Sequence, residues 1–385
     1  MSTPCLFDSY FLGGFECSTH RRRDGKRLDL IEATEHDRFA AQDYRRLAEC
    51  GIRTVRDGLR WHLIETTPGT YDWSSFLPLL RAARDGGMQA IWDLCHYGWP
   101  DGLDIWSPAF VDRFACFVRA AAHVIRDETD DVPFYCPVNE ISYWAWAGGE
   151  VGRFNPVAEG RGGALKRQLV RTAIAGIEAA REVDRRVRFV FAEPAINVIS
   201  HNPAERDAAE SYRRAQFEAF DMLSGRLAPE LGGSEEHLDL IGLNFYSDNQ
   251  WHLGGSTIPL GNHAYRPFRA MLGEAYGRYG RPILIAETGA EGTARPAWLH
   301  YVCAEVRAAV AAGVPVEGIC LYPVVDYAGW DNERPCEVGL LSVPDASGQR
   351  RLDAPFAEEL QRQQAIFAGL FEPVRRRAGR LAAAL

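Results

Sequence analysis

Two glutamates, far apart in the chain, each follow a run of residues that is typical of a buried strand. Glu140 ends the segment 132–140, Val-Pro-Phe-Tyr-Cys-Pro-Val-Asn-Glu, and Glu287 ends the segment 282–287, Pro-Ile-Leu-Ile-Ala-Glu. In a barrel of parallel strands, a carboxylate in this position faces the end at which chemistry takes place. Cleavage of a glycosidic bond requires two such groups, one that donates a proton and one that acts as nucleophile or base.

Strand-like and helical patterns alternate along the whole chain. Strands are predicted at 10–16, 54–61, 88–95, 134–139, 188–193, 238–246, 282–287 and 318–323. Several of these are short apolar runs, of the kind found in parallel sheets buried on both faces. Apolar residues at helical spacing predict helices at 37–49, 74–85, 107–127, 165–183, 204–224, 265–279, 296–312 and 354–370. This alternation predicts a (β/α)₈ TIM barrel, in which the fourth and seventh strands present the two glutamates to one central pocket.

The 385 residues contain no linker, repeat or break in composition. They predict a single α/β domain over 1–385, with a core of about 9–371 and a C-terminal tail of 372–385. A doubly wound parallel sheet is the alternative, and it is expected to carry a glycine-rich phosphate turn after its first strand. Gly13 and Gly14 stand there, but the rest of that fingerprint is missing.

Charge and cysteine content argue against several other classes of function. The net charge of −9, from 43 basic and 52 acidic residues, is opposite to that of a nucleic-acid binder. Nine cysteines lack any C-x-x-C spacing, so neither a disulfide framework nor a metal site is predicted. No apolar stretch has membrane-spanning length, and the first residues do not resemble a signal peptide. We therefore expect a cytoplasmic protein with a small-molecule substrate, no cofactor and no membrane or nucleic-acid partner.

From about residue 11 to about residue 341, the chain resembles glycoside hydrolase family 1, the β-glucosidase-type retaining enzymes of the (β/α)₈ clan A. Val138-Asn139-Glu140 is similar to the family's Thr-Phe-Asn-Glu-Pro motif, and the segment 285–289, Ile-Ala-Glu-Thr-Gly, is similar to its Ile-Thr-Glu-Asn-Gly motif. The resemblance implies that Glu140 is the acid/base and Glu287 the nucleophile.

The second and sixth strands resemble the family as well, and the resemblance implies that Arg56 and Tyr246 support the nucleophile. Their chemistry agrees, because a guanidinium and a phenol hydroxyl both favour the charged form of Glu287. Arg60 lies on the same face of the predicted strand as Arg56, so the pattern alone leaves open which arginine makes this contact. The residues expected to contact the sugar are His20, His96, Asn139, Asn244, Tyr322, Trp330 and Asp331.

The eighth strand departs from the family. The family's motif at this strand is Trp-Ser-Leu-Leu-Asp-Asn-Phe-Glu-Trp, whereas this chain has Tyr-Pro-Val-Val-Asp-Tyr-Ala-Gly-Trp at 322–330. Gly329 therefore stands where the family's glutamate binds the 4- and 6-hydroxyls of the sugar. Trp330, Asp331 and Glu333 are alternatives for that task. His20 or Arg21 stands near the position of a family glutamine after the first strand.

Three functions remain open from the sequence. The first is a retaining β-glycosidase that hydrolyses a small soluble β-glycoside by double displacement. The second is a transglycosidase that uses the same residues, and the third is a non-catalytic barrel that binds a sugar. A basic run at 21–27 could favour an anionic sugar, or it could be a solvated loop. No oligomeric state is predicted.

Overall fold

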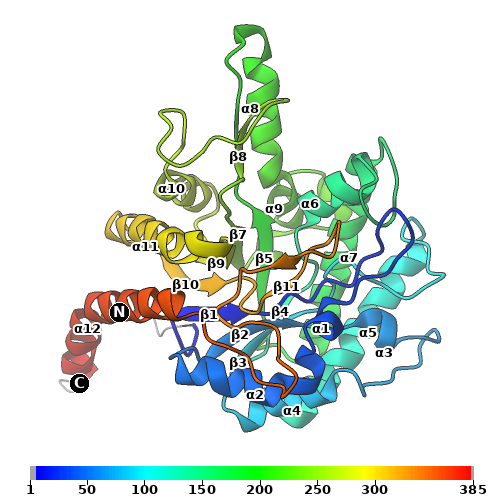
Figure 1. Cartoon of the computed structure of the whole chain (residues 1–385). Helices are drawn as coiled ribbons and strands as arrows, with labels where there is room; N and C mark the ends of the chain where they lie inside the picture. Colours follow the sequence, from blue (N-terminus) through cyan, green and yellow to red (C-terminus); the bar gives the residue numbers. More distant parts are fainter. Residues whose placement is uncertain (1–5, 383–385) are drawn as a thin grey trace.

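A closed barrel of eight parallel strands forms the centre of the molecule (Figure 1). The computed structural model describes residues 6–382, with side chains as far as residue 370. Around the barrel the strand order is β1-β10-β9-β7-β5-β4-β3-β2, so the predicted (β/α)₈ fold is confirmed. The barrel strands are β1 (Phe11–Gly14), β2 (Thr54–Gly58), β3 (Gln89–Asp93), β4 (Phe134–Cys136), β5 (Arg188–Pro194), β7 (Leu240–Asn244), β9 (Ile283–Thr288) and β10 (Val316–Leu321).

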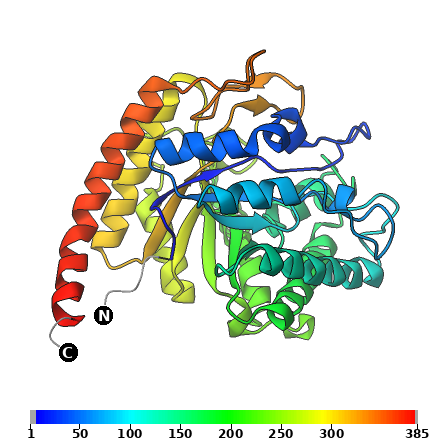
Figure 2. The ribbon, with the colours of Figure 1, turned by 90° about the horizontal axis from the view of Figure 1, so that it is seen from below.

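Helices surround the barrel (Figure 2). The main ones are α2 (His36–Glu49), α4 (Leu77–Asp85), α5 (Pro108–Glu128), α7 (Gly162–Val183), α8 (Arg206–Arg214), α9 (Glu218–Leu223), α10 (Phe268–Tyr279), α11 (Arg295–Ala311) and α12 (Ala354–Ala382). The helix α12 lies alongside α11 and continues into the tail, past the predicted end at residue 370. None of the helices in the described part of the chain is long and apolar enough to cross a membrane.

The prediction of one helix over 204–224 was wrong. The chain forms α8, then a turn of 3₁₀-helix at Ala215–Phe217, and then α9. At this break the Gln216 side chain donates to the carbonyl of Arg213 at 2.6 Å, which occupies an acceptor that a continuous helix would use. In Figure 1, α8 stands away from the barrel, next to a small parallel pair formed by β6 (Asn197–Ile199) and β8 (Gln250–His252).

Alternate residues of the barrel strands other than β2 fill two apolar layers, because successive side chains point to opposite faces. On β5, Val190 and Ala192 belong to the barrel interior, whereas Phe189 and Phe191 belong to the layer under the helices. The interior is filled by Phe7, Leu12, Ile91, Phe134, Cys136, Val190, Ala192, Leu240, Leu284, Ala286, Cys320 and Tyr322. This packed interior holds the strand ends in fixed positions.

Irregular segments follow the carboxyl ends of three strands. The loop 15–29 follows β1, and the short helices α6 (Ile141–Trp144) and η1 (Ala145–Glu150) follow β4. A hairpin of β11 (Tyr327–Ala328) and β12 (Pro335–Cys336) follows β10. Two glycines let the backbone approach Tyr322 here, since a Cβ would lie 2.1 Å from its ring at Gly14 and 2.5 Å from its carbonyl at Gly289. The remaining short elements are α1 (Leu30–Ala33), α3 (Trp61–Ile64), η2 (Pro203–Glu205), η4 (Pro229–Leu231), η5 (Glu235–His237) and η6 (Gly292–Ala294).

Candidate active site

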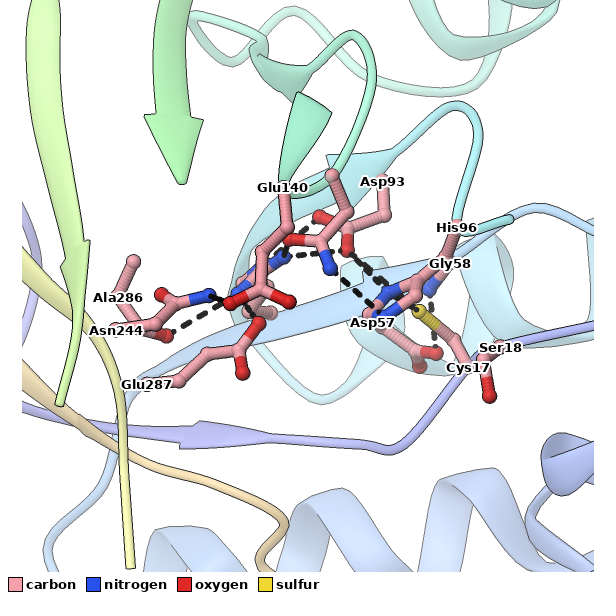
Figure 3. Close-up of polar contacts among 12 residues, drawn as sticks. Cys17, Ser18, Asp57, Gly58, Asp93, His96, Glu140, Asn244, Ala286 and Glu287 are labelled. Carbon is pink, nitrogen blue, oxygen red and sulfur yellow. Dashed lines mark hydrogen bonds and ion pairs between the residues drawn. The ribbon is translucent and has the colours of Figure 1, made fainter. Parts of the chain in front are cut away.

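The side chains of Glu140 and Glu287 lie close to one another at the carboxyl ends of β4 and β9 (Figure 3). Glu287 belongs to β9 itself, next to Asn244 of β7 in the sheet register. Glu140 precedes α6 in the left-handed backbone region, with φ of 44°, and its N–H donates to the carbonyl of Ala192 at 2.9 Å. Such a conformation costs a non-glycine residue on the order of 1 kcal/mol and is common at functional sites. The strained turn directs Glu140 into the site, and its side chain does not cap α6.

Two hydrogen-bond donors hold the Glu140 carboxyl group. The Tyr97 hydroxyl donates to Oε2 at 2.5 Å, and the Asn244 side-chain amide donates to Oε1 at 2.8 Å. Tyr97 also has a left-handed backbone, with φ of 65°, and is fully buried. Asn244 was predicted to contact the sugar, and in the structure its amide N–H contacts the predicted acid while its Oδ1 has no partner among the described residues.

Arg56 and Tyr246 hold the Glu287 carboxyl group. Arg56 Nη1 donates to Oε1 at 2.8 Å, and the Tyr246 hydroxyl donates to Oε2 at 2.8 Å. Arg60, the alternative for the ion pair, contacts Asp29 and Asp37 instead, at 3.4 and 3.2 Å. The structure therefore places Arg56, and not Arg60, against the predicted nucleophile.

Every N–H group of the buried Arg56 guanidinium finds an acceptor. It donates twice to Asp93, at 2.9 and 2.7 Å, and once to the side-chain oxygen of Asn139 at 2.6 Å. The remaining donors reach Glu287 and the carbonyl of Ala286. A guanidinium has five N–H donors, so this one is fully occupied.

The bond from Arg56 also fixes the orientation of the Asn139 amide. Because its oxygen accepts from Arg56, its NH₂ group donates to His96 Nε2 at 2.9 Å and to the Tyr97 hydroxyl at 3.0 Å. His96 Nε2 is then an acceptor, which places the ring proton on Nδ1, 3.0 Å from Asp93 Oδ2. A continuous set of hydrogen bonds thus joins the two glutamates through Arg56, Asn139 and Tyr97.

We expect Arg56→Met to lower the free energy of unfolding by about 3–5 kcal/mol, because Asp93 and Glu287 would remain buried without their cation. The loss is measured by urea denaturation followed by circular dichroism. Arg188→Met is the matched control, since its bidentate pair with Asp239 is partly exposed and is expected to contribute about 1 kcal/mol or less. Equal losses in the two variants would contradict this account of Arg56.

Burial raises the pKa of both catalytic candidates. Burial raises the pKa of Glu140 to about 7, against the lowering effect of its bonds from Tyr97 and Asn244. Burial also raises the pKa of Glu287 to about 7, with Arg56 lowering it and Glu140 raising it further. One negative charge is favoured over two when such groups lie together. Arg56 contacts only Glu287 of the two, so we assign the ionised form to Glu287 and the shared proton to Glu140.

Glu193 is a further buried carboxylate behind the site. Burial raises its pKa to about 7, and it accepts the backbone N–H of Ser142 at 3.0 Å. Its charge raises the pKa of Glu140. Glu193 therefore holds the first turn of α6 in place.

Several buried polar atoms of the site have no hydrogen-bond partner among the described residues. The predicted sugar-binding residues His20, Tyr322 and Trp330 contribute Nδ1, the hydroxyl and Nε1, and Ser18 contributes Oγ. Burial lowers the pKa of His20 to about 3, so its ring is neutral and can accept or donate. Unpartnered buried polar atoms are costly, and they gather where a ligand supplies the missing partners.

A pocket of about 230 Å³ lies next to this cluster. Trp330 and His20 line it, and the Trp330 ring also contacts Tyr97, with centroids 5.7 Å apart. Asp331, predicted to contact sugar, is exposed and forms an ion pair with Arg153 at 2.5 Å. The full lining of this outer pocket is His20, Arg22, Arg23, Asp24, Arg153, Phe154, Trp330 and Asp331.

Acidic side chains neutralise most of the basic run at 21–27. Glu333 pairs with Arg22 at 3.0 Å and with Lys26 at 2.7 Å. Asp101 pairs with both Arg21 and Arg27, at 2.7 and 2.5 Å. Glu333, the alternative for the missing sugar contact, is therefore committed to these cations.

Cys17, Asp93 and His96 are the described residues whose donor atoms come close enough together to suggest a metal site. Their atoms already bond one another, since His96 Nδ1 lies 3.2 Å from the Cys17 sulfur and 3.0 Å from Asp93. Arg56 occupies both Asp93 oxygens, and burial raises the pKa of the Cys17 thiol well above its usual value. A metal needs the thiolate and free carboxylate oxygens, so these residues fit a hydrogen-bonded network better than a metal site.

Sequence reasoning missed Tyr97, Asp93 and Glu16. Asp93 ends β3 and Glu16 follows β1, so the rule that identified Glu140 and Glu287 could have found both. Tyr97 carries no such signal, because its contact with Glu140 depends on a left-handed turn after β3.

Comparison with solved structures gives the same architecture. The family 1 β-glucosidase of Thermotoga maritima superimposes with a TM-score of 0.73 and 15% identity, over 94% of this chain and 98% of that one. The fold is that of the family 1 β-glucosidases. The AHE enzyme of Alicyclobacillus herbarius matches with a TM-score of 0.76 and 16% identity, over 95% and 99% of the two chains. A complex of the Thermotoga maritima β-glucosidase with deoxynojirimycin matches with a TM-score of 0.74 and 15% identity, over 94% and 99%. By sequence, no family model and no curated protein matches the chain.

Proposed function

We propose that this protein is a retaining β-glycosidase that hydrolyses a small β-glycoside. One observation carries the proposal: two neighbouring carboxyl groups, Glu287 buried and Glu140 half-buried, have opposite environments, since Glu287 contacts a guanidinium and Glu140 contacts neutral donors. Pairs of carboxyl groups whose environments separate their protonation states are typical of acid and nucleophile assignments.

In the first step, the Glu287 carboxylate attacks the anomeric carbon while Glu140 gives its proton to the leaving oxygen. The glycosidic bond breaks as the bond to Glu287 forms, and the aglycone leaves as a neutral alcohol. In the second step, Glu140, now ionised, takes a proton from water, and the water oxygen displaces Glu287 from the anomeric carbon. The product is a β-configured sugar, and both carboxyl groups return to their original protonation states.

The surrounding residues supply contacts for the sugar. Asn139 adjoins the acid, and a 2-hydroxyl there would take over an N–H that now serves Tyr97 or His96. Tyr322, His20 and Trp330 offer unpartnered polar atoms to other hydroxyls. These polar atoms suit a small hydroxylated molecule, as in the neighbouring structure that is a complex with deoxynojirimycin.

The test is a panel of p-nitrophenyl glycosides with both anomers and with acidic as well as neutral sugars. We expect cleavage of β-anomers only, and NMR should show the β-configured sugar as the first product. In enzymes that retain the anomeric configuration, the two carboxyl groups lie about 5–5.5 Å apart. Inversion, or the absence of any cleavage, would contradict the proposal. Methanol in the same reactions reports transfer, because a transglycosidase would form mainly the methyl β-glycoside.

We further propose that the barrel is the whole catalytic unit of residues 1–385 and that it works in a reducing compartment such as the cytoplasm. The eight cysteines in the described part of the chain are all unpaired, and most are buried. Disulfide-free proteins rich in cysteine are typical of reducing compartments.

A further inference from the structure

Glu16 is a buried carboxylate of the site that the proposed mechanism does not use. It follows β1 and is 7% exposed. Its Oε1 accepts the backbone N–H of Ser18 at 3.0 Å, and its other oxygen accepts no hydrogen bond from the described residues. Unlike Asp93 and Glu287, it has no arginine or lysine within ion-pair distance in the described part of the chain. A buried carboxylate without a cation requires other donors.

The contacts of Glu16 place it beside the residues expected to hold the sugar. Its Oε1 lies 4.0 Å from His96 Nε2, and that nitrogen lies 2.9 Å from the Asn139 amide. Asn139, next to the acid Glu140, is assigned to the 2-hydroxyl. A pyranose ring carries its hydroxyls in the order 2, 3 and 4, so the series Asn139, His96 and Glu16 places Glu16 at the 3- and 4-hydroxyls.

Glu16 also adjoins the segment in which the family's sugar-binding glutamate is missing. Burial raises the pKa of Tyr322 and of Tyr327, and the negative charge of Glu16 raises both further. Tyr327 begins the β11–β12 hairpin, two residues before Gly329. The two acidic residues of that hairpin are engaged elsewhere, Asp331 with Arg153 and Glu333 with Arg22 and Lys26. A carboxylate that comes from the first strand therefore reaches the region that the eighth-strand loop leaves without one.

We propose, resting on the glycosidase function above, that Glu16 binds the 3- and 4-hydroxyls of the glycone and restricts the enzyme to neutral sugars. A carboxylate oxygen without a protein partner accepts sugar hydroxyls in strong charge-assisted hydrogen bonds. The same uncompensated charge repels a uronic acid or a sugar phosphate. The basic run at 21–27 does not offset this repulsion, because most of its cations already pair with Asp101 and Glu333.

The test uses the aryl β-glycoside that the wild type cleaves best, together with its 3-deoxy and 4-deoxy forms and the matching glucuronide. We expect wild-type kcat/KM to fall about ten- to a hundred-fold for a deoxy substrate that lacks a hydroxyl bound by Glu16. In Glu16→Ala, kcat/KM for the parent substrate should fall by a similar factor. Removing that hydroxyl from the substrate should then cause no further loss in kcat/KM. Glu16→Gln keeps an oxygen for the Ser18 N–H, so we expect this variant to fold. Its kcat/KM should discriminate less between the parent and deoxy substrates, and kcat/KM for the glucuronide should rise relative to that for the parent substrate. The exposed Glu32→Gln is the control and should behave as the wild type.

The assignment would be overturned if folded Glu16→Ala and Glu16→Gln still lost as much kcat/KM as the wild type when the substrate hydroxyl is removed. Calorimetric titration with deoxynojirimycin separates this result from a failure of the proposed function, because binding needs no turnover. If the wild type cleaves no glycoside but binds deoxynojirimycin about tenfold or more tighter than Glu16→Gln, the glycosidase proposal fails and the role of Glu16 is supported. Equal affinity in both proteins, or no binding to either, would overturn the role of Glu16.

Discussion

Glu287→Gly is expected to lose on the order of 10⁴- to 10⁶-fold in kcat, because the variant has no group to form the covalent intermediate. The substitution also leaves space beside Arg56 and Tyr246, which held the missing carboxylate at 2.8 Å each. Azide can occupy that space and attack the same face of the sugar. From a β-glycoside with a good leaving group, the expected product is therefore the α-glycosyl azide, identified by NMR.

The control for this experiment is Glu291→Gly, which removes an exposed glutamate in the loop after the same strand. It should keep wild-type activity and gain nothing from azide. Full activity in Glu287→Gly would show that another residue is the nucleophile. A β-azide from that variant would mean that the two glutamates have the opposite roles.

The fold was predictable because several of the barrel strands are short apolar runs that stand out from the helical patterns. Buried parallel strands need apolar residues on both faces, as in the alternation of Val190 and Ala192 with Phe189 and Phe191 on β5. The break between α8 and α9 was not predictable in the same way. The break depends on the hydrogen bond from the Gln216 side chain to the Arg213 carbonyl, and the spacing of apolar residues does not predict such a bond.

The two glutamates were predictable because strand ends of a barrel converge, whatever their separation in sequence. The partners of Glu140 were harder to foresee. Tyr97 reaches the acid only through a left-handed turn, and Asn244 donates to it across the barrel mouth from β7. Asp331 was assigned to the sugar from its place in the sequence, and in the structure it pairs with Arg153 in the lining of the pocket beside Trp330. The shape of the loops, rather than the barrel, decided these contacts.

Glu140→Ala is expected to reduce kcat/KM by about 10²- to 10⁴-fold for an alkyl glycoside, whose leaving oxygen needs a proton. The loss should be far smaller for a dinitrophenyl glycoside, because that leaving group departs as an anion and leaves only the second step impaired. Azide should then accelerate turnover and give the β-glycosyl azide. Glu193→Gln serves as the comparison, since it removes a neighbouring buried carboxyl group whose contact is with a backbone N–H.

The pH dependence follows from the raised pKa of Glu140. With its pKa raised to about 7, this group is protonated below that pH, so proton donation is lost as the pH rises through about 7. The wild-type kcat/KM for the alkyl glycoside should fall on the alkaline side. For the dinitrophenyl glycoside, Glu140→Ala should lack that alkaline fall. An alkaline fall that persists in Glu140→Ala with the dinitrophenyl substrate would assign proton donation to a different residue.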